Sequence, residues 1–300
     1  MNVQMQRIID GLMSRYSRRV PDVPAILETM QKEKLITGPG DIENDHIAFR
    51  TIGVPQLGIR SLEKIFINGG YKKMDYYFFP EKKLNAFWYS PPAPQLPRIF
   101  ISELRVGDLS ELAQKTILKY TSQVKLDPVD YLDLSDTEAV DDFLHSSLWT
   151  IPTWDDYLLL SKESEYAAWV IFNGYYLNHF TISVHNLKSG YNTILLFNNF
   201  LEKNGFTLND SGGKFKQSPD QLLIQSSTVA QLVEVEFSDG SKHPIAGSYV
   251  EFAERRVLPE YVHLPSSELK AFHRREGFEV QNANRIFEST YNSQTRRALL

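Results

Sequence analysis

Two stretches of alternating polar and apolar residues, 45–51 (DHIAFRT) and 178–184 (NHFTISV), predict short β-strands. Successive side chains of a strand point to opposite faces, so His46 and Arg50 share one face of the first strand. His179 occupies the corresponding polar face of the second strand. Each strand therefore combines an apolar packing face with a polar face that carries one histidine. This arrangement suggests that the two histidines contribute to one metal site.

The same order of elements follows both histidine strands. A helix with Ser61 as a plausible N-cap is expected to end at Gly69-Gly70, and a second helix is expected over residues 189–203. Gly70-Tyr71 and Gly205-Phe206 follow their histidines at nearly equal spacing. The expected strands cover residues 71–79, 84–89 and 98–104 after the first helix, and 206–208, 221–227, 232–237 and 248–253 after the second. The chain thus contains two copies of a strand–helix–strands unit.

We therefore expect an α+β protein in which the two modules form a curved sheet, or half-barrel, around a metal site. Helices lie outside, and His46 and His179 point inward. Pairing of the modules covers sheet edges that would otherwise be open. The predicted organisation is a single catalytic domain over residues 1–300, with N-terminal helices at 1–40, a first module at 41–105, a helical connector at 106–170, a second module at 171–256 and a C-terminal segment at 257–300.

Composition narrows the possible functions. The formal net charge of −5 and the absence of a dense Lys/Arg run argue against a nucleic-acid partner. The chain has no cysteine, which excludes disulfides, thiolate metal sites and a cysteine nucleophile. Neither a signal peptide nor a membrane-spanning apolar run is evident, so the expectation is a cytoplasmic protein without a membrane partner. The composition leaves the oligomeric state open.

A third metal ligand is expected on the strand within residues 247–256. Glu251 shares the face of Tyr249 there and lies between bulky apolar neighbours, whereas Glu254 is followed by two arginines and suggests an ion pair at the strand end. Two imidazoles and one carboxylate form the facial triad typical of non-haem Fe(II) chemistry. Zinc, manganese or nickel could occupy the same ligands in purified protein. The alternative is a pair of core histidines with a salt-bridged glutamate.

Other polar residues suggest the substrate. Arg50 lies four residues after His46 on the same predicted face, where its guanidinium could clamp a carboxylate. A structural pair with an acidic residue is the alternative. Gln225 and Ser227 could donate hydrogen bonds to a substrate, or they could be ordinary strand residues. His185 lies roughly 20 Å along an extended chain from His179 and is a poor ligand. The remaining histidines, expected at the surface, are His145, His243, His263 and His273.

Residues 45–51, 152–157, 247–255 and 277–291 resemble the 2-oxoadipate dioxygenase/decarboxylase family, whose members are also called D-2-hydroxyglutarate synthases. The resemblance covers nearly the whole chain and implies a vicinal-oxygen-chelate-like fold. It implies Fe(II) held by His46, His179 and Glu251, with Arg50 on the substrate carboxylate. The implied reaction converts 2-oxoadipate and O2 into 2-hydroxyglutarate and CO2, a step of lysine catabolism.

Two other classes of function remain open at this stage. One is a different metal enzyme on the same scaffold, either a glyoxalase-like isomerase or an extradiol-type dioxygenase. The other is a metal-free module that binds a dicarboxylate through Arg50.

Overall fold

The computed structural model describes residues 2–296, which fall into two compact units. Among the described residues, the first unit comprises 2–19, Ile47–Asn178 and Leu232–Gly247, and the second comprises Val20–His46, His179–Gln231 and 248–296. Helices and strands are interspersed in both units, which confirms the predicted α+β class. The single catalytic domain with its five segments stays a prediction.

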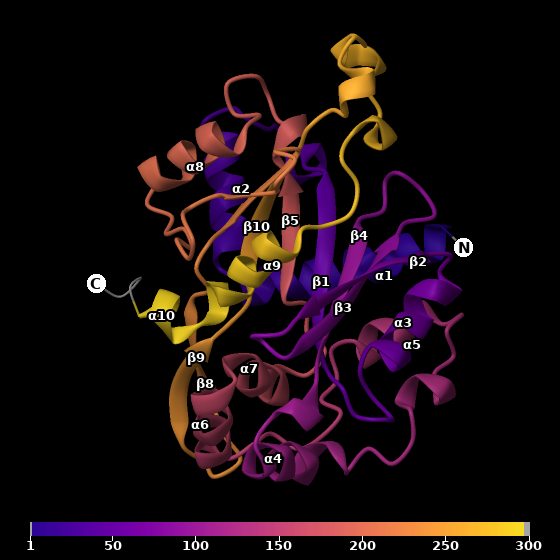
Figure 1. Ribbon diagram of the computed structural model, residues 1–300, viewed down its shortest axis with the longest axis vertical. Helices are drawn as coiled ribbons and strands as arrows, with labels where there is room; N and C mark the ends of the chain where they lie inside the picture. The colour runs from indigo at the N-terminus through magenta and orange to yellow at the C-terminus, as the bar shows by residue number, and fades with distance from the viewer. Residues whose placement is uncertain (1, 297–300) are drawn as a thin grey trace. The chain divides into compact units, whose positions relative to one another are not determined.

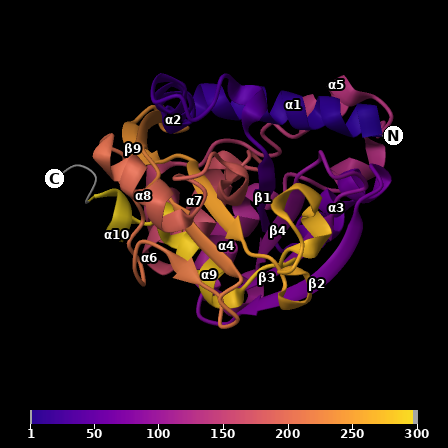
Figure 2. The same cartoon turned by 90° about the horizontal axis from the view of Figure 1, so that it is seen from above.

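The first unit contains a strand order of β2-β3-β4-β1, a separate β8-β9 hairpin and several helices (Figure 1). Figure 2 shows α1 running beside α5, where Arg15 forms an ion pair with Asp141 at 2.8 Å. The elements are α1 (Asn2–Arg19), β1 (Asn44–Ile52, which begins in the second unit), α3 (Ile59–Asn68), β2 (Lys72–Phe79), β3 (Leu84–Ser90), β4 (Arg98–Leu104), α4 (Glu111–Thr121), α5 (Thr137–Phe143), α6 (Trp154–Glu163), α7 (Glu165–Asn173), β8 (Leu232–Glu236) and β9 (Lys242–Ala246).

The second unit has the strand order β1-β5-β10-β7-β6, with β1 contributing its first residues. Strand β10 pairs in parallel with β5, which lies beside it in Figure 1, and antiparallel with β7. The elements are α2 (Asp22–Lys32), β5 (His179–Ser183), α8 (Ile194–Lys203), β6 (Lys216–Gln217), β7 (Leu223–Ser227), β10 (Tyr249–Arg255), α9 (Val280–Ile286) and α10 (Asn292–Thr295).

The predicted internal repeat is present in the order of the elements. The first copy is β1-α3-β2-β3-β4, and the second is β5-α8-β6-β7-β10. The strand orders correspond as well, because β1-β4-β3-β2 in one copy matches β5-β10-β7-β6 in the other. The second copy carries the β8-β9 hairpin as an insertion between its last two strands. The histidine strands β1 and β5 therefore occupy equivalent positions.

Several predicted boundaries are wrong for local reasons. Ser61 is not an N-cap: α3 begins at Ile59, and the Ser61 hydroxyl instead donates to Asp127 Oδ1 at 2.6 Å. The second module's helix begins only at Ile194, where the Thr193 hydroxyl accepts the capping hydrogen bond. Residues 206–208 form no strand beyond an isolated bridge at Leu208, and β6 lies later in the chain.

The connector contains more helix than its sequence pattern indicates. The stretch 149–157 is rich in aromatic residues and contains Pro152, yet Trp154 already begins α6. The Thr153 hydroxyl accepts from the Asp156 amide and caps this helix, and Ser164 caps α7 in the same way through the Ala167 amide. Two capped helices in succession explain why a single long period is not visible in the sequence.

Aromatic packing joins α8 to the strands of the second unit. The Phe197 ring lies 5.1 Å from that of Phe252 on β10 and 5.6 Å from that of Phe200, measured between centroids. Phe197 and Phe252 are fully buried, and their edge-to-face geometry is favourable for aromatic rings. This cluster fixes the helix against the reverse side of the strand that carries Glu251.

Among residues 2–296, no helix is both long enough and apolar enough to cross a membrane.

Replacing Phe197 by alanine should lower the free energy of unfolding by about 3–5 kcal/mol, because the change leaves a cavity in a closely packed core. Denaturant titration followed by circular dichroism measures this loss. Leu195→Ala on the same helix is the matched control, since Leu195 is 60% exposed and should change stability by under ~0.5 kcal/mol. Equal effects of the two substitutions would contradict the packing described here.

Candidate metal centre

Strands β5 and β10 and the first residues of β1, all in the second unit, bring His46, His179 and Glu251 together. In the register of β10 against β5, Glu251 is opposite Thr181 and Tyr249 is opposite His179. Glu251 and Tyr249 therefore project on the face that carries His179, as the alternation in sequence predicted. His46, near the start of β1, supplies the third side chain.

The three side chains are in mutual contact. The distance from His179 Nε2 to Glu251 Oε2 is 3.0 Å, and the distance from His46 Nε2 to Glu251 Oε1 is 3.4 Å. The two imidazole Nε2 atoms are 3.4 Å apart. All three residues are buried, and their potential ligand atoms lie within 4.8 Å of one another. Among residues 2–296, this group of His and acidic side chains is close enough to hold a metal ion.

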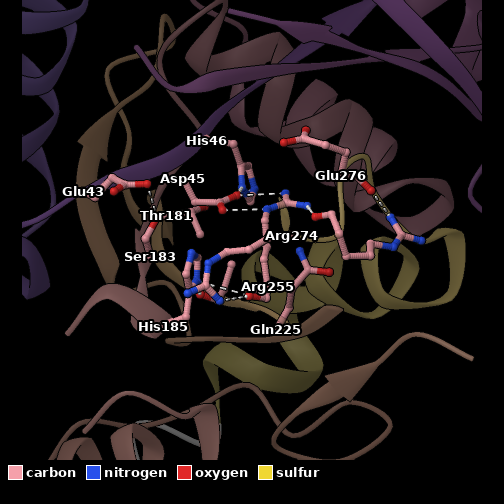
Figure 3. Close-up of polar contacts among 12 residues, drawn as sticks. Glu43, Asp45, His46, Thr181, Ser183, His185, Gln225, Arg255, Arg274 and Glu276 are labelled. Carbon is pink, nitrogen blue, oxygen red and sulfur yellow. Dashed lines mark hydrogen bonds and ion pairs between the residues drawn. The ribbon is translucent and has the colours of Figure 1, made fainter. Parts of the chain in front are cut away.

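A buried ion pair fixes the orientation of His46. The Asp45 carboxylate lies 2.9 Å from His46 Nδ1 and receives two hydrogen bonds from Arg255, at 2.7 Å from Nε and 2.9 Å from Nη2 (Figure 3). Arg255 also donates to the backbone oxygen of Gly277, at 2.8 Å. Because Asp45 accepts from Nδ1, Nε2 is the nitrogen of His46 that faces Glu251 and His179. Carboxylate–histidine pairs of this kind orient metal ligands.

Amide and aromatic side chains complete the surroundings of the group. Gln225 Nε2 donates to Glu251 Oε1 at 2.6 Å, and its own oxygen accepts from Asn282 Nδ2 at 3.0 Å. The ring of Phe278 packs edge-on against His46, with centroids 4.8 Å apart. Tyr249 lies at the same centroid distance from His179. These contacts hold the Glu251 carboxylate and both imidazole rings in place.

The electrostatics of the group favour a cation. Burial disfavours the imidazolium form of His46, but the charge of Glu251 and the hydrogen bond to Asp45 outweigh it and raise the pKa of His46 above its ordinary value. Burial by itself would raise the pKa of Glu251, but the interactions with His46 and His179 outweigh burial, so the pKa of Glu251 is lowered. The carboxylate is therefore ionised and available as a ligand.

The residues present fit a divalent transition metal. Two imidazole nitrogens and one carboxylate are the donors of the facial triad. His46 Nε2 also lies 3.1 Å from the Thr181 hydroxyl, so in this protein the converging atoms are all polar. The site thus has the donor chemistry for a metal, and a donor set of this type accommodates several divalent ions.

The competing acid and the other histidines have different partners. Glu254 forms an ion pair with Arg256 at 2.9 Å, as its sequence context suggested, and accepts from the Ile194 amide at the start of α8. His185 accepts a hydrogen bond from the Arg255 amide at 3.2 Å, and burial lowers its pKa to about 4. The expectation of a surface position is wrong for His273, which is buried because its ring packs on Tyr261 and Phe272. His263 is exposed, whereas His145 and His243 are half-buried.

The expected substrate residues lie in different surroundings. Arg50 belongs to the first unit, where it is buried and its guanidinium lies 5.1 Å from the ring centroids of Tyr166 and Trp169. Gln225 contacts Glu251 directly, as described above. Ser227 is the register partner of Glu251 on β7, and its hydroxyl hydrogen-bonds that of Ser289 at 2.8 Å. Their roles toward a substrate stay predictions.

The sequence interpretation missed the residues that support the group. Asp45 and Arg255 form a buried pair although 210 positions separate them, and Asn282 and Phe278 come from the C-terminal segment. Asp45 could have been identified from its position, since an acidic residue inside a buried strand requires a partner. Its partner Arg255 shares the parity of Glu251 and is the last residue of β10, whereas Arg256 lies beyond the strand. The sequence does not show where the strand ends, so the two arginines are alike in it.

The order of strands defines an α+β protein with a vicinal-oxygen-chelate-like fold, and its converging His-His-Glu group could hold a metal ion. A glyoxalase superfamily protein from Ralstonia eutropha shares the fold, with a TM-score of 0.70 over 91% of this chain and 84% of its own, at 18% identity. The chain belongs to the 2-oxoadipate dioxygenase/decarboxylase family, whose model matches residues 8–264. The resemblance noted in the sequence is thereby confirmed.

Two plant relatives show how far the similarity extends. The chloroplastic 2-oxoadipate dioxygenase/decarboxylase of Arabidopsis thaliana is 44% identical over 301 aligned positions, which cover 97% of this chain and 78% of the relative. The crystal structure of the hydroxyglutarate synthase from Oryza sativa in complex with 2-oxoadipate has a TM-score of 0.89 and 44% identity, covering 98% of this chain and 94% of that one. Family and fold therefore agree over almost the whole sequence.

Replacing Arg255 by methionine should destabilise the metal-free protein by about 3–5 kcal/mol, because it leaves the buried Asp45 carboxylate without its cation. Arg285→Met is the control: the Arg285 side chain is 51% exposed, so its pair with Glu288 at 3.7 Å should contribute no more than about 1 kcal/mol. Denaturant unfolding of both variants measures the difference. Similar losses at the two positions would contradict the importance given to the Asp45–Arg255 pair.

Proposed function

We propose that this protein is an Fe(II)-dependent dioxygenase/decarboxylase that converts 2-oxoadipate and O2 into 2-hydroxyglutarate and CO2, within lysine catabolism. The observation that carries the proposal is the buried His46-His179-Glu251 group in a chain of the 2-oxoadipate dioxygenase/decarboxylase family. The plant relatives named above support the substrate, since one is a 2-oxoadipate dioxygenase/decarboxylase and the other was crystallised with 2-oxoadipate.

In this proposal His46, His179 and Glu251 are the metal ligands. Iron bound by three protein ligands would supply Lewis acidity toward a 2-oxo acid and one-electron chemistry toward O2, which side chains alone lack. Zinc, manganese or nickel would fit the same donors and displace iron in a purified sample. The proposal assigns iron because the reaction consumes O2.

The protein groups around the ligands hold them in a reactive arrangement. Asp45 keeps the proton of His46 on Nδ1, so that Nε2 remains free to bind a metal. Gln225 donates to Glu251 Oε1 and thereby fixes the plane of the carboxylate. Phe278 and Tyr249 pack against the two imidazoles and limit the access of water to the site. A fixed and partly dry ligand set favours the bound substrate over competing water.

Arg50 is assigned to the carboxylate at the far end of the substrate. It follows His46 on β1 with the same parity, and its buried guanidinium suits bidentate recognition of a carboxylate. Holding that end fixes which carbon of the substrate faces the metal. Gln225 and Ser227 are assigned to the substrate's surroundings; the Gln225 amide has a second N–H beyond the one given to Glu251.

We also retain a cytoplasmic location as part of this proposal. The relative from Arabidopsis thaliana is chloroplastic, so membership of the family does not fix the cellular compartment. Detection of the tagged protein after cell fractionation tests the assignment.

The test of the proposed function is an assay of iron-loaded protein with 2-oxoadipate. Oxygen uptake, CO2 release and 2-hydroxyglutarate formation should occur in equal amounts. An isomerase would consume no O2, and an extradiol enzyme would require a catechol substrate. A protein that binds iron yet takes up no O2 with 2-oxoadipate would contradict the proposal.

Glu251→Ala should abolish iron binding and oxygen uptake, because two neutral imidazoles alone hold Fe(II) weakly. Metal content after dialysis, measured by atomic emission, reads the loss, and circular dichroism checks the fold. Glu254→Ala is the matched control from the same strand and should retain full iron content. Iron retention in the Glu251 variant would remove this residue from the ligand set.

Arg50→Met should raise the KM for 2-oxoadipate by about 10- to 100-fold, the loss expected for a charged hydrogen bond to a carboxylate. Iron content should stay at the wild-type value, because Arg50 is not assigned as a ligand. Steady-state oxygen uptake with metal analysis measures both quantities. An unchanged KM would show that Arg50 does not bind the substrate.

A further inference from the structure

A buried lysine lies on the same face of the second unit as the metal ligands. Lys216 on β6 is the register partner of Gln225 on β7, and Gln225 is in turn the partner of Ala253 on β10. Cross-strand partners project to the same face of a sheet, and Ala253 shares parity with Glu251. The Lys216 side chain therefore emerges on the face where Gln225 contacts Glu251.

The ammonium of Lys216 has few partners for a buried charge. The residue is 4% exposed, and Nζ donates one hydrogen bond, to the backbone oxygen of Asn209 at 2.7 Å. In the part of the chain that the structure describes, no acidic group forms an ion pair with it; nearby Glu288 is engaged by Ser211 and Arg285. An ammonium has three donors, so two remain for another acceptor.

The Lys216 ammonium interacts electrostatically with Glu251. Burial lowers the pKa of Lys216 to about 8, and of the acidic groups that oppose this effect Glu251 acts most strongly, ahead of Asp210 and Glu288. A buried cation without an ion-pair partner costs folding free energy unless an anion joins it. The missing anion would then be a ligand rather than a protein group.

We propose that Lys216 is a specificity-determining residue whose ammonium binds the carboxylate of the substrate that lies far from the metal. This inference rests on the proposed function, because it needs a 2-oxo dicarboxylate held at its other end by the metal group. Lys216 would therefore favour a dicarboxylate, because a 2-oxo acid with an alkyl end offers the ammonium no acceptor.

The dimensions of the unit agree with this assignment. Strand β7 separates β6 from β10, so the backbone of Lys216 lies about 10 Å from β10 at ordinary strand spacing. A dicarboxylate bound through its 2-oxo acid end extends its other carboxylate away from the metal, and the flexible lysine stem approaches it from β6. A carboxylate accepts several hydrogen bonds, so the two N–H donors of Lys216 that remain can both be satisfied by it.

The test compares two ligands that differ only at the far end, 2-oxoadipate and 2-oxohexanoate. Both are titrated calorimetrically into iron-loaded protein under argon, and both are assayed by oxygen uptake in air. The variants are Lys216→Met, which removes the charge at similar volume, and Lys216→Arg, which keeps it. Lys203→Met is the control, because Lys203 is an exposed lysine of the same unit.

Lys216→Met should raise the Kd and KM for 2-oxoadipate by about 10- to 100-fold and leave those for 2-oxohexanoate unchanged. Lys216→Arg should retain most of the preference for the dicarboxylate, and the control should behave as the wild type. A purely structural role, in which Lys216 only anchors the Asn209 backbone, would weaken both ligands equally. Equal weakening, or no change with either ligand, would overturn the proposal. Lys216→Gln provides a second neutral variant if the methionine variant does not fold.

Failure of the proposed function gives a different result from failure of this inference. If the wild-type protein takes up no O2 with 2-oxoadipate, the reaction assignment fails. The anaerobic titrations still read whether Lys216 discriminates between a dicarboxylate and its alkyl counterpart.

Discussion

The Asp45 carboxylate, shared between His46 and Arg255 in the interior of the second unit, is the interaction on which the site depends. It neutralises a buried guanidinium and at the same time fixes the ring of a predicted metal ligand. A carboxylate in this position is costly without both partners. The arginine is held further by backbone oxygens of the C-terminal segment, which ties residues far apart in sequence to one imidazole. The geometry of the His46-His179-Glu251 group is thus a consequence of how the whole second unit folds.

The internal repeat explains why the site is assembled from strands rather than loops. Strands β1 and β5 are equivalent elements of the two copies, and each contributes a histidine. The acid comes from the last strand of the second copy, which pairs directly with β5. Strand elements hold side chains more rigidly than loops do, and a metal ligand set benefits from that rigidity. One fold can host different functions, so the reaction is assigned from the family and the His-His-Glu group and not from the fold.

Much of the fold, and the convergence of His46, His179 and Glu251, could be predicted from the sequence, because strand alternation is a local property. Strand alternation and apolar neighbours favoured Glu251, and the two arginines after Glu254 argued against that residue. The repeated order of elements paired His46 with His179. Residues whose role depends on distant partners could not be predicted in this way. Arg255 and Lys216 are buried by packing between segments, and their sequence neighbourhoods resemble those of surface cations. Helix starts were also misjudged, since Gly58 rather than Ser61 precedes α3 and its backbone adopts a positive φ of 83°.

The central claim is that one substrate receives both atoms of O2 at a site built from His46, His179 and Glu251. The most direct measurement is a turnover of 2-oxoadipate under 18O2 followed by mass spectrometry of the products. The account predicts two labelled oxygens in 2-hydroxyglutarate, one in the new carboxylate and one in the hydroxyl group, and unlabelled CO2. A 2-hydroxyglutarate product without label, or turnover without O2, would contradict it.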